Sequence, residues 1–176
     1  MNNSTTNRVV LGGLLMAMVF IATVVTKIPM ASGYFNLGDI FVMISGILLG
    51  RYFGFAVGGI SSAMADIYSG CSIYAPITFI VKGLEAFVVA AIFSNKEKTA
   101  GRFKTIIGVI CGSVIMVGGY FIAESFILNH IDKSLGLSMA IKDLPVNGIQ
   151  GGLSSVISYL LITILNKANI INDKKL

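Results

Sequence analysis

The sequence is organised around residues 74–87, YAPITFIVKGLEAF, an apolar stretch that contains two charged side chains, Lys82 and Glu85. An unpaired charge near the middle of a bilayer costs about 3 kcal/mol, so charges kept at that depth usually face a partner, a cavity or a substrate. Lys82 and Glu85 are three residues apart and therefore share one face of a helix, where they can pair. We expect this face to line a ligand pocket.

The composition of the whole chain indicates a membrane protein. Of its 176 residues 55% are hydrophobic and 12% are charged, and the mean hydropathy is +0.86, whereas about 25% of a soluble domain is charged. The net charge of +5 would suggest a nucleic-acid partner in a soluble protein, but here the basic residues fall in short loops and tails, where they set orientation. We expect residues 9–25 to be a retained membrane span, because no convincing signal-peptide cleavage site follows them.

Apolar segments separated by polar or glycine-rich breaks predict one membrane domain, residues 1–176, that is all-α and forms a compact bundle of six transmembrane helices. The expected helices are 8–26, 37–50, 52–69, 76–93, 105–128 and 144–165. The second is short for a span of about 20 residues, so it should be tilted, shielded by its neighbours or extended by part of 33–36. The prolines are expected at helix ends, at Pro29, Pro76 and Pro145.

The basic residues predict that both termini are cytoplasmic. With the N-terminus inside, most of them fall on the inner side, and the loop 94–104 is the strongest inner marker. The inner residues are Arg8, Arg51, Lys96, Lys98, Arg102, Lys104, Lys167, Lys174 and Lys175. The outer residues are Lys27, Lys133 and Lys142.

Under this topology the other strongly polar side chains within or beside the spans fall in the outer half of the membrane. They are Asp39, Asp66, Lys82, Glu85, Glu124, Asn147 and Gln150. A proton or ion pathway would need polar groups through the whole thickness. The asymmetry therefore favours capture of an external solute over a channel.

Several of these side chains also have a structural interpretation. Asp39 could cap the second helix, and Asp66 could lie at headgroup depth. Lys82 and Glu85 could pair only to fix the packing of the bundle. The amides of the sixth helix could bridge to neighbouring helices.

Small residues recur at four-residue spacing, which lets helices approach closely in lipid. The series 46, 50, 54 and 58 is all glycine, and most such positions should pack inside the bundle. The first helix has Gly12, Gly13 and Ala17 towards its cytoplasmic end. That face could dock another membrane protein, and internal packing is an equal alternative.

Several chemistries are excluded or disfavoured. The chain has no G-x-x-x-x-G-K-[ST] loop, so we expect no ATP hydrolysis and no cofactor of its own, and no His or Cys cluster has metal-ligand spacing. Cys71 and Cys111 should lie at different depths, which argues against a disulfide. Two alternatives to solute capture stay open: a self-sufficient secondary transporter or channel, and an intramembrane aspartyl protease using Asp39 and Asp66.

Three runs carry a resemblance to a known family: GYFNLGDIFVMISGILLGRYFGFAVGGISSAMADIYSG (33–70), YAPITFIVKGLEAF (74–87) and DLPVNGIQGGLSSVISYLL (143–161). Together they resemble the substrate-binding S components of energy-coupling factor (ECF) vitamin transporters, most closely the riboflavin, hydroxymethylpyrimidine or pyridoxine branch. The resemblance implies a membrane-bound subunit that is not an enzyme and that captures a vitamin or vitamin precursor from outside. It also implies partners, namely a transmembrane T protein and two cytoplasmic ATPases that use the ATP.

The resemblance also implies roles for particular residues. Mapped by position, the ligand contacts are Tyr34, Asn36, Asp39, Lys82, Glu85, Glu124, Asn147 and Gln150, with the loop from Ala31 to Asn36 closing over the ligand. The family's small-residue motif that meets the T protein matches Gly13 and Ala17. The ligand itself stays open between hydroxymethylpyrimidine or a vitamin B6-like compound and, as a second choice, riboflavin.

Overall fold

The computed structural model describes residues 3–93 and 102–168, most of which are helical. The helices are α1 (Asn3–Val25), α2 (Asp39–Leu49), α3 (Arg51–Tyr68), α4 (Ala75–Phe93), α5 (Arg102–Ile122), the π-helix η1 (Ala123–Leu128), α6 (Asn129–Ile131) and α7 (Leu137–Lys167). A short antiparallel pair, β1 (Ile28–Pro29) with β2 (Tyr34–Phe35), follows α1. Because α5, η1 and α6 are continuous, the described residues form six helical segments, the number expected.

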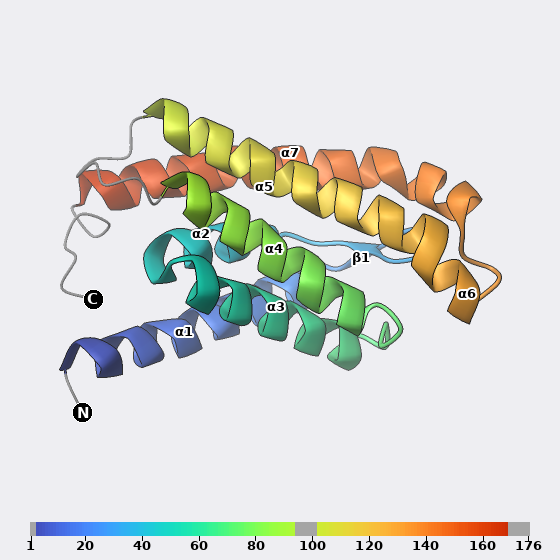
Figure 1. Ribbon diagram of the computed structural model, residues 1–176, viewed down its shortest axis with the longest axis horizontal. Coiled ribbons are helices and arrows are strands. Elements are labelled where there is room, and N and C mark those ends of the chain that lie inside the picture. The colour runs from blue at the N-terminus through green and yellow to red at the C-terminus, as the bar shows by residue number, and fades with distance from the viewer. Residues whose placement is uncertain (1–2, 94–101, 169–176) are drawn as a thin grey trace.

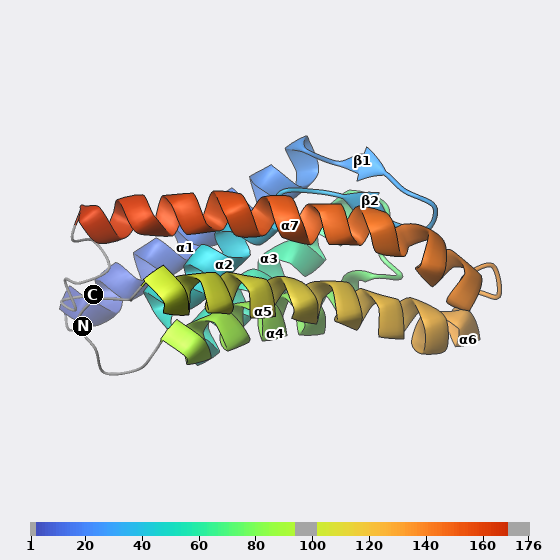
Figure 2. The same ribbon diagram turned by 90° about the horizontal axis from the view of Figure 1, so that it is seen from above.

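The helices lie side by side in one elongated bundle (Figure 1). α4 packs against α2, α3 and α5, while α1 packs against α2 and α3. α5 and α7 run alongside each other for most of their length (Figure 2). α1 begins and α7 ends at the same end of the bundle (Figure 1). The hairpin of β1 and β2 lies beside α7, which brings the loop after α1 next to the last helix (Figure 2).

Four helical segments of the described chain are long and apolar enough to cross a membrane: Thr5–Val25, Ala75–Phe93, Arg102–Ile131 and Leu137–Lys167. The shortest has 19 residues, or about 28 Å, close to the hydrocarbon thickness of about 30 Å. Large apolar side chains cover their outer faces, for example Leu14, Val114 and Leu160, each more than half exposed. Such a surface suits lipid and is costly in water.

α2 is not extended by residues 33–36, because Tyr34 and Phe35 form a strand. It has 11 residues, about 16 Å of helix, roughly half of what a span needs. Of the three explanations for its shortness, shielding fits best, since most of its residues are buried among its neighbours. It ends at Gly50, whose φ of 84° lies in the left-handed region that glycine adopts without a Cβ clash.

Glycines allow α2, α3 and α4 to pack closely. A Cβ at Gly46 would overlap the carbonyl oxygen of Ala86, and a Cβ at Gly54 would lie 2.7 Å from the Cα of Gly46. The prediction of internal packing is therefore confirmed for these two members of the glycine series. The close approach fixes α4, and with it Lys82, against α2.

The last helix differs most from its expected range, because it begins at Leu137 rather than at residue 144. Pro145 lies inside α7 instead of at its start, although an internal proline costs a helix about 3 kcal/mol. The turn before it is tied down by Asp143, which accepts hydrogen bonds from the loop after α1. Pro29 also does not mark a helix end, because it belongs to β1.

The remaining boundary differences are small, as is usual at helix ends. The segment expected at 105–128 runs from Arg102 to Ile131 and changes to a π-helix in its second half. The expected inner loop at 94–104 lies mostly outside the described residues. Lys96, Lys98, Lys174 and Lys175 lie outside them as well, so the orientation stays a prediction.

Candidate ligand-binding site

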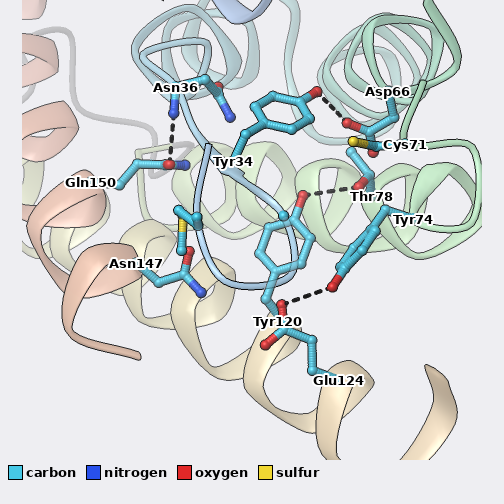
Figure 3. Close-up of a pocket in the computed structure, with 12 residues that line it drawn as sticks. Tyr34, Asn36, Asp66, Cys71, Tyr74, Thr78, Tyr120, Glu124, Asn147 and Gln150 are labelled. Atoms are coloured by element: carbon cyan, nitrogen blue, oxygen red, sulfur yellow. Dashed lines mark hydrogen bonds between the residues drawn. The ribbon is translucent and has the colours of Figure 1, made fainter. Parts of the chain in front are cut away.

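A small pocket lies near the end of the bundle where α4 begins (Figure 3). Its lining comes from the loop after α1, from the connection between α3 and α4, and from α3, α4, α5, η1 and α7. The lining residues are Met30, Gly33, Tyr34, Asn36, Asp66, Cys71, Tyr74, Thr78, Tyr120, Glu124, Asn147 and Gln150. The cavity volume is ≈ 30 Å³, room for about two water molecules. The pocket is therefore nearly closed in this conformation.

On one side of the pocket Tyr34 donates a hydrogen bond from its hydroxyl to Asp66 Oδ1 (Figure 3). Burial and the neighbouring Asp66 carboxylate raise the pKa of Tyr34, so its hydroxyl stays a neutral donor at physiological pH. Lys27 lies over the Tyr34 ring, with its Nζ 4.9 Å from the centroid. The second oxygen of Asp66 has no hydrogen-bond partner among the described residues, which leaves a buried acceptor at the pocket wall.

The pocket contains two more tyrosines. The hydroxyls of Tyr120 and Thr78 are 3.0 Å apart, and the Tyr74 hydroxyl lies 3.5 Å from Glu124 Oε1 (Figure 3). Oε2 of Glu124 is buried without a hydrogen-bond partner in the described part of the chain. A buried unsatisfied acceptor costs about 1–3 kcal/mol, so both carboxylates favour a ligand or water that donates N–H or O–H groups.

Glu124 reaches the pocket from the π-helix η1. π-helical segments are rare and occur mostly at functional sites, because the wider turn redirects the side chains that follow it. Glu124 is only 3% exposed and lines the pocket. Its contact with a ligand stays a prediction.

A cluster of buried charges lies directly behind the pocket. Lys82 forms an ion pair with Asp39, and its Nζ lies 3.5 Å from Glu85 Oε2. All three side chains are at most 2% exposed. The pairing of Lys82 with Glu85 expected from their spacing is present, but Asp39 is the closer partner. The N-cap of α2 is Gly38, so Asp39 is not the capping residue.

Gln150 joins the buried cluster to the pocket. Its Nε2 donates to Asp39 Oδ2 at 2.8 Å, and its Oε1 accepts the backbone N–H of Asn36 at 2.9 Å. Lys82 also lies under the pocket wall, with its Nζ 5.4 Å from the centroid of the Tyr120 ring. The cluster therefore contacts two groups that line the cavity, the Gln150 amide and the Tyr120 ring, and it fixes their orientation.

The structure places the predicted site residues in two layers. Those that line the pocket are Tyr34, Asn36, Glu124, Asn147 and Gln150. Asp39, Lys82 and Glu85 are not among the described lining residues, and their direct contact with a ligand stays a prediction.

Sequence reasoning left out several lining residues, notably Tyr74, Thr78 and Tyr120. Helical spacing could have found them. Thr78 and Lys82 share one face of α4, and Tyr74, directly before this helix, continues the same spacing. Tyr120 precedes Glu124 by four positions. For Asp66 the sequence left a position at headgroup depth open. In the structure Asp66 lines the pocket.

The small residues of α1 divide between two environments. A Cβ at Gly12 would lie 2.8 Å from the ring of Phe53, so Gly12 packs inside the bundle. Gly13 and Ala17 are exposed, and no described atom outside the helix's own backbone and the neighbouring residues lies within 4 Å of a Cβ placed at Gly13. The flat strip they form is available to a partner.

A bundle with four apolar helices of membrane length, which encloses a polar, tyrosine-lined pocket near one end, has the architecture of a membrane solute-binding protein. The sequence model described as "ECF-type riboflavin transporter, S component" matches residues 3–167, and the chain belongs to this family. The family's members are membrane-embedded, vitamin-binding subunits that work with a T protein and ATPases, and they are not enzymes.

The fold agrees with this assignment. The chain is similar to a solved structure titled "Structure and mechanism of the S component of a bacterial ECF transporter", with a TM-score of 0.76 and 21% identity over 95% of this chain and 98% of that one. It is also similar to a protein of Pyrococcus woesei described as "Uncharacterized protein in gap 3'region". The two are 36% identical over 104 residues, which is 58% of this chain and 68% of the relative.

Family membership excludes the aspartyl protease alternative, since S components are not enzymes. The side chains agree with this outcome. Asp39 is paired with Lys82, and Asp66 is bonded to Tyr34. Each carboxylate therefore has a partner of its own. A catalytic dyad requires instead that the two carboxylates share one proton.

Proposed function

We propose that this protein captures a vitamin or vitamin precursor in the pocket of Figure 3 and delivers it across the plasma membrane through a separate ATP-driven coupling module. The observation that supports this most directly is a buried polar pocket in a chain of the S component family. By the distribution of basic residues the pocket faces outward, and both termini are cytoplasmic.

The pocket chemistry favours a small heteroaromatic ligand rich in hydrogen-bond donors. Tyrosine rings offer stacking surfaces, and the amides of Asn147 and Gln150 can read ring nitrogens and exocyclic groups. The unpartnered oxygens of Asp66 and Glu124 would accept N–H or O–H groups. Hydroxymethylpyrimidine or a vitamin B6-like compound suits this set, and riboflavin is the second candidate.

The size of the pocket supports the smaller ligands. A cavity that binds one benzene ring measures about 150 Å³, whereas this one measures ≈ 30 Å³. Any ligand must therefore displace part of the lining, and a single ring requires less displacement than a three-ring flavin. The loop from Ala31 to Asn36 belongs to a part of the wall that is not helical and that contains only two residue pairs of sheet, so we assign the opening and closing movement to it.

In this proposal the two layers of the site have different tasks. Tyr34 and Tyr120 would stack against the ring, and Asn147 would bond to its edge. Lys82 and Asp39 would hold Gln150 in the orientation that faces the ligand. After capture the whole bundle would reorient in the membrane, with the ATPases of the coupling module supplying the energy.

We assign docking of the T protein to the exposed strip at Gly13 and Ala17, where a partner helix could approach closely. Gly13→Leu should reduce the amount of T protein that co-purifies with this chain when both are expressed together. Gly118→Leu is a matched control, because a Cβ there also meets no described atom within 4 Å. Equal recovery of T protein with both variants would remove α1 from the interface.

The experiment that tests the proposed function is mass spectrometry of small molecules released from the protein purified in mild detergent. A thermal-shift panel of vitamins and precursors would accompany it. A co-purifying heterocycle that also stabilises the protein at submicromolar concentration is the expected result. An empty protein that no vitamin in the panel stabilises would contradict the proposal.

A further inference from the structure

The hairpin between α1 and α2 is tied to α7 by one buried carboxylate, Asp143. Its Oδ1 accepts the backbone N–H of Ala31 at 3.0 Å, and its Oδ2 accepts the backbone N–H of Ser32 at 3.0 Å. The hydroxyl of Ser32 donates to the same Oδ2. Asp143 is 1% exposed. Hydrogen bonds to a carboxylate are stronger than those between neutral groups, so this is a firm attachment for a two-residue turn.

The tied segment is a wall of the pocket. Met30, Gly33 and Tyr34, which flank the bonded pair, all line the cavity, whereas Asp143 is not among the described lining residues. The hairpin has a second attachment to α7 where Gln150 accepts the N–H of Asn36. Gln150 faces the cavity and belongs to the binding machinery. Asp143 bonds to the hairpin and is near enough to Glu124 and Tyr74 to interact with them electrostatically, but it does not itself line the cavity among the described residues.

The hairpin must move for a ligand to enter. With both attachments in place the cavity measures ≈ 30 Å³, well below the roughly 150 Å³ that accommodates one aromatic ring. Most of the other walls are helices packed against their neighbours, apart from Cys71 and Tyr74 in the connection between α3 and α4. The hairpin contains only two residue pairs of sheet. Opening therefore has to break the bonds to Asp143, together with those of Tyr34 to Asp66 and of Asn36 to Gln150.

We propose that Asp143 is a positioning residue that latches the hairpin over the pocket and thereby sets the rates of ligand entry and release without touching the ligand. Opening breaks its bonds to Ala31 and Ser32, and closing restores them. The part that concerns ligand exchange rests on the proposed function. The latch itself does not, because it can be measured with no vitamin present.

Cys71 provides a ligand-free reporter, because it lines the pocket. Partial burial raises the pKa of the Cys71 thiol, but the side chain is still partly exposed, so its alkylation has a basal rate that opening should increase. In a Cys111→Ser background Cys71 is the single cysteine, since the chain has two. A rise in the rate of its alkylation by N-ethylmaleimide over that of the unsubstituted hairpin, in detergent-purified protein, then reports more frequent opening of the pocket.

Asp143→Ala should raise the alkylation rate of Cys71 by about tenfold or more, since a factor of ten corresponds to the net loss of about one hydrogen bond. Ser32→Ala removes one of the three bonds and should cause a smaller rise. Asp132→Ala is the matched control. Asp132 accepts the N–H and the hydroxyl of Ser134 in the same manner, but on an exposed loop, so its loss should leave the rate unchanged.

Cys111 distinguishes a latch from general stabilisation, because it lies within a membrane-length helix away from the hairpin. In a Cys71→Ser background the alkylation rate of Cys111 should be the same with and without the D143A substitution. An unchanged Cys71 rate in both D143A and S32A would overturn the proposal. A parallel rise at Cys111 would overturn it as well, since Asp143 would then stabilise the whole fold.

Ligand exchange gives the second arm of the test. For a vitamin identified by the thermal-shift panel, D143A should raise both the association and the dissociation rate constant, whereas loss of a ligand contact raises chiefly the dissociation rate constant. Failure to find any vitamin would count against the proposed function and leave the cysteine result intact. Normal exchange rates in D143A, with a vitamin that binds, would count against the latch alone.

Discussion

Two polar regions lie next to each other in this bundle, and they differ in whether a buried cation accompanies their carboxylates. In the cluster behind the pocket a cation, Lys82, lies within ion-pair distance of Asp39 and Glu85, and all three side chains are at most 2% exposed, although neither oxygen of Glu85 has a hydrogen-bond partner among the described residues. In the pocket lining Asp66 and Glu124 each keep one oxygen without a partner among the described residues, beside an open space. Charged side chains at similar depth can thus serve different purposes, since one region fixes structure and the other is suited to a ligand.

The largest expected effect follows from breaking the buried cluster. Lys82→Ala would leave Asp39 and Glu85 as buried carboxylates without a cation, which costs about 3–5 kcal/mol. We expect a marked fall in the melting temperature in detergent, together with loss of ligand binding. Lys142→Ala, which removes an exposed lysine, is the control and should melt as the wild type does. A normal melting temperature for Lys82→Ala would show that the cluster is not structural.

The next effect separates the lining from the cluster. Asn147→Ala removes an amide that lines the pocket and is not part of the ion cluster of Asp39, Lys82 and Glu85. Binding should therefore weaken by about 10–100-fold, the equivalent of about 1–3 kcal/mol. The melting temperature without ligand should change little. Titration of the purified variant with the identified vitamin measures the first effect, and a thermal melt of the same ligand-free variant measures the second. An unchanged affinity would remove Asn147 from the site.

A smaller effect is expected for Tyr34→Phe, which keeps the ring and removes the hydroxyl that bonds to Asp66. Loss of one hydrogen bond of this kind changes a binding free energy by about 1 kcal/mol, so affinity should fall by roughly fivefold. Tyr68→Phe is the control, because Tyr68 is an exposed tyrosine at the end of α3. Equal affinity of the two variants would contradict a role for the Tyr34 hydroxyl.

The smallest effect concerns the pH dependence of Cys71 in the intact protein. Because burial raises the pKa of this thiol, its alkylation should require a higher pH than a solvated cysteine, whose pKa is about 8.5. Lys27 acts in the opposite direction, which keeps the shift limited. The rate of alkylation between about pH 7 and 10, compared with the same protein unfolded in detergent and urea, gives the shift. Coincident profiles would indicate an open pocket.

The sequence predicts those parts of the fold and site that depend on local spacing. The apolar segments give the number of helices, and the three-residue interval between Lys82 and Glu85 gives their pairing. Tyr34, Asn36, Glu124, Asn147 and Gln150 were found because they are polar residues at one depth in a family pattern. Both signals require only the order of residues along the chain.

What escaped prediction depends on contacts between distant parts of the chain. Lys82 pairs most closely with Asp39, which is 43 positions away, and Gln150 bonds to Asp39 across 111 positions. The early start of α7 is stabilised in the same way, since Asp143 bonds to the hairpin after α1. The π-helical turn that directs Glu124 inward has no evident signature in the local composition. Burial and pairing at these points follow from the packed bundle, not from periodicity.

The most direct test of the central claim is native mass spectrometry of this chain alone, purified without any T protein or ATPase. We predict one small heterocyclic molecule bound per chain, which is displaced by the vitamin that stabilises the protein most and which is lost in Asn147→Ala. A chain that carries no added mass, with or without added vitamins, would contradict the claim that this pocket captures a vitamin or its precursor.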